Sequence, residues 1–130
     1  MKILLDTCAI LWAVSEPDKL SPKVKGLLLD QDTEIFVSVI SCAEIACASD
    51  RNRIQLNRHW KKWFNYYIDF NGWNCLDINL KIIEEAFSLP GEFHNDPADR
   101  ILVASSRLYS SKLVTADKKI LEYPHVDAIW

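Results

Sequence analysis

Short apolar runs alternate with segments of helical spacing along the whole chain, and this alternation restricts the fold more than any other feature of the sequence. It predicts strands at residues 2–5, 35–39, 75–78 and 113–115, with a candidate edge strand at 126–129. It predicts helices at residues 8–14, 22–30, 41–48, 58–70, 81–89, 97–109 and 118–121. Strands that alternate with helices favour an α/β fold, with a mostly parallel sheet of four to five strands and helices on both faces.

Capping residues mark the ends of several predicted helices. Ser21 precedes Pro22, which is the order of an N-cap followed by proline at the first helical position. Ser41 and Glu44 have the S-x-x-E spacing of a capping box, so the third helix is expected to begin at Ser41. Gly72 is expected to close the fourth helix.

Length and composition indicate one compact domain over residues 1–130. The chain has 130 residues, of which 49% are hydrophobic and 25% charged. It lacks an apolar run near the roughly 18 residues of a membrane span, and Lys2 is followed by Asp6 where a signal peptide would be apolar. We therefore expect a cytoplasmic protein with no membrane association. The formal net charge of −3 does not favour general nucleic-acid binding, so any contact with RNA is expected to be local.

The cysteines are predicted to be structural. Cys8, Cys42, Cys47 and Cys75 form no C-x-x-C pair, and most have apolar neighbours in the sequence. We expect them to behave as small buried hydrophobic side chains rather than as zinc ligands or disulfides.

Acidic residues recur where strands are predicted to end or helices to begin: Asp6, Glu44, Asp96, Asp99 and Asp117. Each alone has an ordinary interpretation as a turn residue, a cap or an acid favoured by the helix dipole. Together they are harder to explain, because the carboxyl ends of parallel strands meet at one edge of the sheet.

Convergence of these carboxylates would require a neutralising partner. Two unit charges about 4 Å apart repel by roughly 4 kcal/mol at an effective dielectric constant near 20. The sequence has no lysine or arginine beside Asp6 or Glu44. Bound Mg²⁺ or Mn²⁺ is therefore the expected cofactor, and metal-assisted hydrolysis of a phosphodiester is the expected chemistry.

Four motifs in this order cover nearly the whole chain: ILLDT, S-x-x-E, FHNDPADR and VTAD. With them the sequence resembles the PIN-domain nucleases, and in particular the VapC-type toxin ribonucleases of toxin–antitoxin pairs. The resemblance implies a single PIN-like domain that cuts RNA endonucleolytically, pairs with a cognate antitoxin and forms a homodimer. One departure is Ala98, where relatives often carry a bulky apolar residue.

The resemblance also implies roles for individual residues. The catalytic, metal-holding acids would be Asp6, Glu44, Asp99 and Asp117. Asp96 would be an accessory acid or a loop organiser, and Thr7 and Thr115 would orient ligands or phosphate.

Two further residues of the FHNDPADR block have open interpretations. Arg100 either contacts phosphate or forms a salt bridge that fixes the acids, and the second is favoured because of its place next to Asp99. His94 either acts as a ligand or acid, or orders the loop through hydrogen bonds, and again the second is favoured.

Basic and aromatic residues are interleaved between residues 51 and 67. They could grip RNA, form a groove for a partner helix, or belong to an amphipathic helix with one buried and one solvated face. The candidates for an RNA or partner surface are Arg51, Arg53, Arg58, Trp60, Lys61, Lys62 and Trp63.

The leading hypothesis is thus a metal-dependent ribonuclease toxin, with two alternatives. One is a phosphotransferase or phosphatase with Asp6 as nucleophile, although Cys8 stands where that class needs a second aspartate. The other is a receiver-like or catalytically silent binding module, whose acids only hold structure or a regulatory cation.

Overall fold

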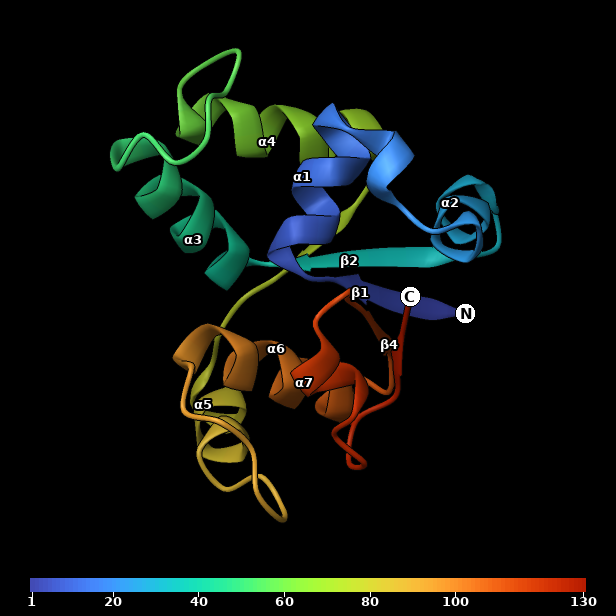
Figure 1. The fold of residues 1–130 in the computed structure, drawn as a ribbon, viewed down its shortest axis with the longest axis vertical. Coiled ribbons are helices and arrows are strands. Elements are labelled where there is room, and N and C mark those ends of the chain that lie inside the picture. The colour runs from blue at the N-terminus through green and yellow to red at the C-terminus, as the bar shows by residue number, and fades with distance from the viewer.

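A five-stranded parallel sheet lies between two layers of helices in the computed structural model, which describes residues 1–130 (Figure 1). The strand order is β3-β2-β1-β4-β5, so β1 is central and β3 and β5 are the edges. The strands are β1 (Lys2–Leu5), β2 (Glu34–Ser38), β3 (Asn74–Leu76), β4 (Lys112–Val114) and β5 (Ala128–Ile129). The predicted α/β class and parallel sheet are confirmed.

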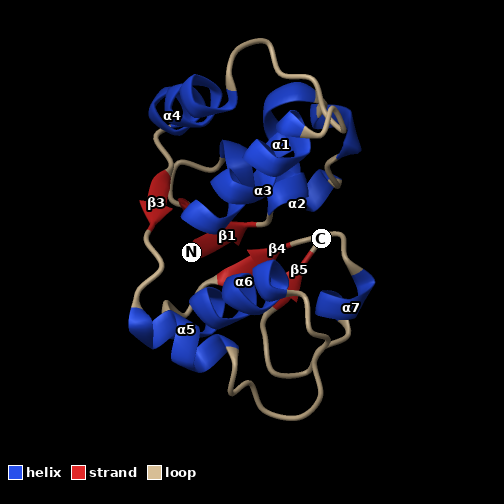
Figure 2. Ribbon diagram, turned by 90° about the vertical axis from the view of Figure 1, so that its left-hand side faces the viewer, coloured by secondary structure: helices blue, strands red, loops and turns tan.

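Helices from the two halves of the chain cover opposite faces of the sheet (Figure 2). One layer contains α1 (Thr7–Ser15), the short 3₁₀ helix η1 (Pro17–Lys19), α2 (Pro22–Leu29), α3 (Val39–Asp50) and α4 (Trp60–Asn71). The other contains α5 (Leu80–Ala86), α6 (Pro97–Leu108) and α7 (Lys118–Leu121). None of these helices combines the length and hydrophobicity that crossing a membrane requires.

The central strand explains why both layers are needed. Ile3 and Leu5 are fully buried on the side of α1 and α4, where they share a core cluster with Trp63. Leu4 points the other way and packs in a second cluster with Leu102 of α6. Successive side chains of a strand alternate between faces, so a strand covered on both sides must be apolar throughout.

The predicted start of the third helix is wrong. Strand β2 runs directly into α3, whose N-cap is Ser38, with the Ser38 hydroxyl accepting a 3.1 Å hydrogen bond from the Ile40 amide. Ser41 lies inside the helix and is completely buried, so the capping box with Glu44 does not form. A serine at the end of the strand supplies the cap one turn earlier, and Glu44 therefore lies in the second turn.

The prediction of buried cysteines is also wrong. Cys8, Cys47 and Cys75 are exposed, and only Cys42 is half-buried. Their apolar neighbours in the sequence lie on other faces of the same elements: in α1, for example, Ala9 is buried while Cys8 points outward. Helical geometry, which turns each residue about 100° from the last, separates residues that are adjacent in the chain.

Candidate active site

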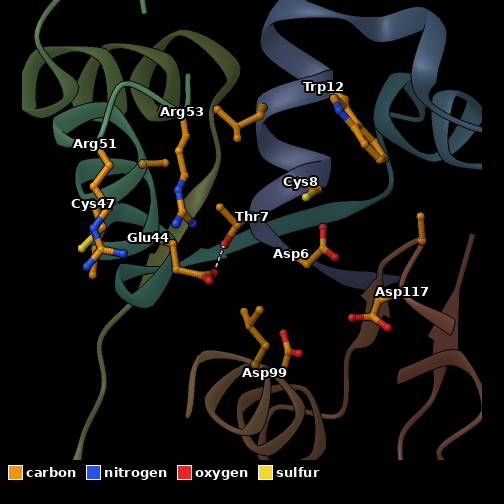
Figure 3. A pocket seen from close by; sticks show the side chains of 15 residues that line it. Asp6, Thr7, Cys8, Trp12, Glu44, Cys47, Arg51, Arg53, Asp99 and Asp117 are labelled. Carbon is orange, nitrogen blue, oxygen red and sulfur yellow. Dashed lines mark hydrogen bonds between the residues drawn. The ribbon is translucent and has the colours of Figure 1, made fainter. Parts of the chain in front are cut away.

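Four carboxylates line one cavity of about 730 Å³ near the carboxyl ends of the strands (Figure 3). Each comes from a different part of the fold: Asp6 follows β1, Glu44 lies in α3, Asp99 in α6, and Asp117 follows β4. The structure thus brings together all four acids that the resemblance singles out. Asp96 does not line the cavity.

Asp6 is the most buried of these acids and is held at the start of α1. It is the N-cap of that helix, and its Oδ1 accepts a 2.8 Å hydrogen bond from the Ala9 amide. Burial raises the pKa of Asp6, and the charges of Glu44 and Asp117 raise it further. The Thr115 hydroxyl and the Ala9 amide act in the opposite direction and lower it.

Glu44 is oriented by the first residue of α1. The Thr7 hydroxyl donates a 2.5 Å hydrogen bond to Oε1 of Glu44 and lies 3.0 Å from the Ser41 hydroxyl. Ser41 is completely buried, so these two contacts hold the Thr7 side chain of α1 against α3. Thr7 thus contacts a site carboxylate directly, and its role in orienting ligands stays a prediction.

Asp99 lies in the first turn of α6 and has the largest upward pKa shift of the four acids. Burial raises its pKa to about 7, and the nearby charges of Asp96, Asp117, Glu44 and Asp6 add to the increase. Nε2 of His94 lies 3.2 Å from Oδ2 of Asp99. The carboxyl group is therefore partly protonated at neutral pH when nothing else neutralises the cluster.

Asp96 is a loop organiser by geometry. It is the N-cap of α6, and its Oδ1 accepts hydrogen bonds from the amides of Ala98 (2.9 Å) and Asp99 (3.2 Å). Its own amide lies within hydrogen-bonding distance of Nδ1 of His94, at 3.4 Å. His94 thus contacts both acids of the loop, as expected of a residue that orders it.

Asp117 is fixed by a similar turn after β4. It is the N-cap of α7, with Oδ1 accepting a 2.8 Å hydrogen bond from the Lys119 amide. The hydroxyl of Thr115, which is fully buried, accepts a 3.0 Å hydrogen bond from the Asp117 amide. Thr115 therefore acts on two of the four acids. Its hydroxyl accepts the hydrogen bond from the Asp117 amide, and it also lowers the pKa of Asp6 and so favours the charged form of that acid.

The salt bridge predicted for Arg100 does not form. The guanidinium donates to three backbone carbonyls, those of His94 (2.9 Å), Ala86 (3.0 Å) and Phe93 (2.8 Å). It makes no salt bridge with an acid and does not line the cavity. A planar group with several fixed donors suits a loop whose carbonyls lack partners, and Arg100 here ties the loop between α5 and α6.

The basic and aromatic segment divides into two parts. Arg51 and Arg53 line the cavity with the acids, whereas Lys61 and Lys62 are exposed on α4 and do not. The arginines are therefore the members of the segment that the fold brings to the site.

The aromatic members of this segment lie away from the cavity. Trp63 is 1% exposed within the main core cluster, and the half-buried Trp60 packs against that cluster and does not line the cavity. The Arg58 guanidinium lies 4.2 Å from the centre of the Tyr66 ring, away from the cavity. For Trp63 the amphipathic-helix interpretation is correct.

Several cavity residues were not predicted. They share helical spacing with predicted acids: Cys8, Leu11 and Trp12 lie on one face of α1, and Cys47 and Ala48 follow Glu44 by three and four residues on α3. The spacing from Glu44 also reaches Arg51, seven residues on. That spacing was the available signal for Cys47 and Ala48, which lie within the predicted helix 41–48, whereas Arg51 lies beyond its predicted end.

The cavity offers the oxygen donors that a hard cation prefers, but these donors are spread around it and do not form a closed cage. No group of three or more His, Cys, Asp or Glu residues is arranged as a ready metal cage. Mg²⁺ usually keeps several waters and binds through one or two carboxylates plus substrate phosphates, so an open set of oxygen donors suits it. Burial is the main cause of the raised pKa values of Asp6 and Asp99, the neighbouring carboxylates add to it, and a bound cation would favour the charged form of both acids.

Known proteins are similar to this chain in sequence and in fold. Ribonuclease VapC22 from Mycobacterium tuberculosis is 29% identical over 123 residues, which are 95% of this chain and 92% of that protein. The crystal structure of VapBC2 from Rickettsia felis bound to a promoter DNA fragment is similar in fold, with a TM-score of 0.72 at 17% identity, covering 100% of this chain and 99% of that chain. A toxin-antitoxin complex from Klebsiella pneumoniae gives a TM-score of 0.68 at 18% identity over 98% of this chain and 96% of that chain.

The family model of the PIN domain matches residues 3–126, from the first strand to the last connection before β5. This range includes all four carboxylates of the cavity. The chain therefore belongs to the PIN domain family.

Proposed function

We propose that this protein is a metal-dependent endoribonuclease and the toxin of a toxin–antitoxin pair. The observation that carries the proposal is the meeting of Asp6, Glu44, Asp99 and Asp117 in one cavity, with raised pKa values at Asp6 and Asp99. The similarity to Ribonuclease VapC22 supports RNA as the substrate.

The four carboxylates are the proposed ligands of Mg²⁺ or Mn²⁺, with Thr7 and Thr115 orienting Glu44 and Asp6. When bound, the cation supplies Lewis-acid stabilisation of the charge that develops on the phosphate oxygens. The protein holds the acids in place through the caps at Asp6 and Asp117, and a carboxylate oxygen accepts the proton of the attacking water. Hydrolysis of the backbone phosphodiester follows.

Cation binding by these acids should depend on pH. A carboxyl group with a pKa of about 7 must lose its proton before it can act as a ligand, so binding at Asp99 releases a proton near neutrality. Affinity for the cation is therefore expected to rise as the pH is raised through 7.

The test is cleavage of labelled single-stranded RNAs and structured transfer RNAs by the purified protein with Mg²⁺, Mn²⁺ or EDTA. Asp99→Asn is expected to abolish cleavage. Asp69→Asn, which removes one charge from an exposed position on α4, is the matched control and should cleave normally. Metal-independent cleavage, or equal cleavage by Asp99→Asn, would contradict the proposal.

The same experiment tests the alternative of a silent binding module. This alternative differs in its expected result: a folded protein that cleaves no RNA with either metal and keeps its partner when Asp6 and Asp99 are replaced by asparagine.

The proposed partners are an antitoxin and a second copy of this chain. The similar structures from Rickettsia felis and Klebsiella pneumoniae were solved as toxin–antitoxin complexes, which supports the first. Exposed apolar side chains, among them Leu29 at 83% and Phe70 at 71%, offer surface for such contacts. Light scattering after size-exclusion chromatography, alone and after co-expression with a candidate antitoxin, tests both partners.

A further inference from the structure

Two arginines at the end of α3 line the same cavity as the carboxylates. Arg51 and Arg53 are exposed, and neither forms an ion pair with any acid of the protein. Figure 3 shows both side chains on the flank of the cavity beside Glu44. The two guanidinium groups therefore lie beside the carboxylates without forming salt bridges to them.

The backbone explains why both arginines reach this flank. Asn52, between them, has a left-handed conformation (φ 55°), and the Arg53 amide donates a 2.9 Å hydrogen bond to the Ala48 carbonyl. This is the pattern of a Schellman helix end, which turns the chain back on itself. Attraction to the helix dipole would account for Arg51 at the C-terminus of α3, but Arg53 lies beyond the helix and is positioned by the turn.

An aromatic side chain lies on the other flank. Trp12 of α1 lines the cavity on the side away from the arginines (Figure 3). Its ring is half-buried and is held edge-on by Trp130, with 5.5 Å between the ring centres. Nζ of Lys19 lies 5.8 Å from the centre of the same ring, and the indole also packs against the main core cluster. The part of the ring that lines the cavity is therefore the surface on which a flat ligand can stack.

We propose that Arg51, Arg53 and Trp12 form a subsite for single-stranded RNA around the carboxylates. In this arrangement, which rests on the proposed ribonuclease function, the arginines bind backbone phosphates on one side of the scissile bond and one base stacks on Trp12 on the other. Basic groups that follow the backbone, combined with aromatic rings that stack bases, are the usual means of holding single strands. Paired bases in a duplex are not free to stack on a side chain, so the subsite selects unpaired RNA.

RNA binding by this protein requires a local positive charge, because its net charge has the same sign as that of RNA. The chain has 18 acidic and 15 basic residues other than histidine, for a net charge of −3. Uniform attraction to phosphate is therefore absent, and the two free arginines beside the acids supply the attraction where the phosphate must sit.

The first experiment measures binding of a labelled single-stranded oligoribonucleotide by fluorescence anisotropy over a range of salt, in Mg²⁺ and in an Asp99→Asn background that leaves the strand intact. Arg51→Gln/Arg53→Gln is compared with Lys23→Gln/Lys81→Gln, which removes the same charge from exposed positions on α2 and α5. Loss of two phosphate contacts should reduce the slope of log K against log salt by about 1.4, at about 0.7 per phosphate in single strands. The lysine control should keep the slope of the background protein.

The second experiment locates the base that stacks on Trp12. Oligoribonucleotides with an abasic nucleotide at successive positions are bound to Trp12, Trp12→Phe and Trp12→Ala proteins. One abasic position should weaken binding about tenfold to the first two proteins and have little further effect with Trp12→Ala. This non-additivity reports contact between the base and the ring, which a general loss of stability would not produce.

Equal salt slopes for the arginine and lysine variants, or additive effects at every abasic position, would overturn the subsite. So would arginine variants that bind and cut RNA like the parent protein but lose a co-expressed protein partner, because the arginines would then be a docking surface. These outcomes leave metal-dependent cleavage by the parent protein intact. A parent protein that neither binds nor cuts RNA overturns the proposed function and the subsite together.

Discussion

The hydroxyl of Thr7 lies 2.5 Å from Oε1 of Glu44, joining the first residue of α1 to the second turn of α3. Glu44 does not follow a strand directly but lies in the second turn of α3, so its place in the site depends on the packing of α3 beside α1. The contact both orients the acid and links the two helices that form this side of the cavity.

Replacing Thr7 by valine tests the orientation of Glu44. Valine keeps the shape of threonine but cannot donate the hydrogen bond, so the folded protein should lose about 1 kcal/mol of stability. Activity or metal affinity should fall by about tenfold, the lower end for loss of a group that supports a ligand. Denaturant unfolding and cleavage kinetics measure the two effects, and Thr7→Ser, which keeps the hydroxyl, should stay near the parent protein in both.

Asp99 should make the stability of the metal-free protein depend on pH. Its pKa is raised from the ordinary value of 3.8 to about 7 in the folded protein, so the folded state holds this proton more tightly than the unfolded state. The stabilisation of the folded state by this proton is fully present below the unfolded pKa of 3.8 and is lost as the pH rises through the folded pKa of about 7. The free energy of unfolding should therefore fall as the pH rises between these two values.

Asp99→Asn should flatten that pH dependence and stabilise the metal-free protein at pH values above the folded pKa, because it removes one charge from the cluster. Urea unfolding in EDTA at a series of pH values measures the effect. The exposed control Asp69→Asn should follow the parent curve; if it flattens the curve as much as Asp99→Asn does, Asp99 is not the source.

Asp6 combines a structural cap with a site charge, and two substitutions separate these roles. Asparagine keeps an oxygen for the Ala9 amide and removes a charge that burial disfavours, so metal-free Asp6→Asn should be at least as stable as the parent protein. Asp6→Ala loses the cap and should be less stable than Asp6→Asn by about 1 kcal/mol.

Both Asp6 variants should also lose the stabilisation by Mg²⁺ or Mn²⁺ that the parent protein shows. A cation at about 100 times its dissociation constant stabilises a folded protein by about 2.7 kcal/mol, so thermal unfolding with and without metal gives the readout. Undiminished stabilisation of Asp6→Asn by metal would place the cation elsewhere.

Arg100 should position Asp99 through the loop that it holds. Arg100→Lys keeps the charge but cannot reach three carbonyls at once, so we expect a loss of about 2 kcal/mol in stability and faster proteolysis within residues 91–96. Metal-induced stabilisation should fall as well, because His94 and Asp96 contact Asp99 from this loop.

The matched control for Arg100 is Arg107→Lys, at the other end of α6. Arg107 also binds a carbonyl, that of His125, and a carboxylate, that of Glu85, but it lies away from the cavity. This variant should lose stability and retain its response to metal. Equal metal responses in the two variants would assign Arg100 a purely structural role.

The sequence by itself determined the layers of the fold and the ends of several elements. The apolar run at 2–5 required burial on both faces, and local hydrogen bonds fixed the caps at Ser21 and Asp96 and the left-handed end of α4 at Gly72. These features depend on residues close together in the chain, so spacing and residue type suffice to predict them.

Tertiary structure decided which side chains face the cavity. The packing of α3 against its neighbours buries Ser41 and brings Glu44 to Thr7, and Arg51 at the end of the same helix lines the site. Two further features depend likewise on neighbours distant in sequence: the hydrogen bond from Arg100 to the Ala86 carbonyl and the burial of Trp63. A helix can turn any face toward the sheet at little local cost, and only the packing of several elements together selects one.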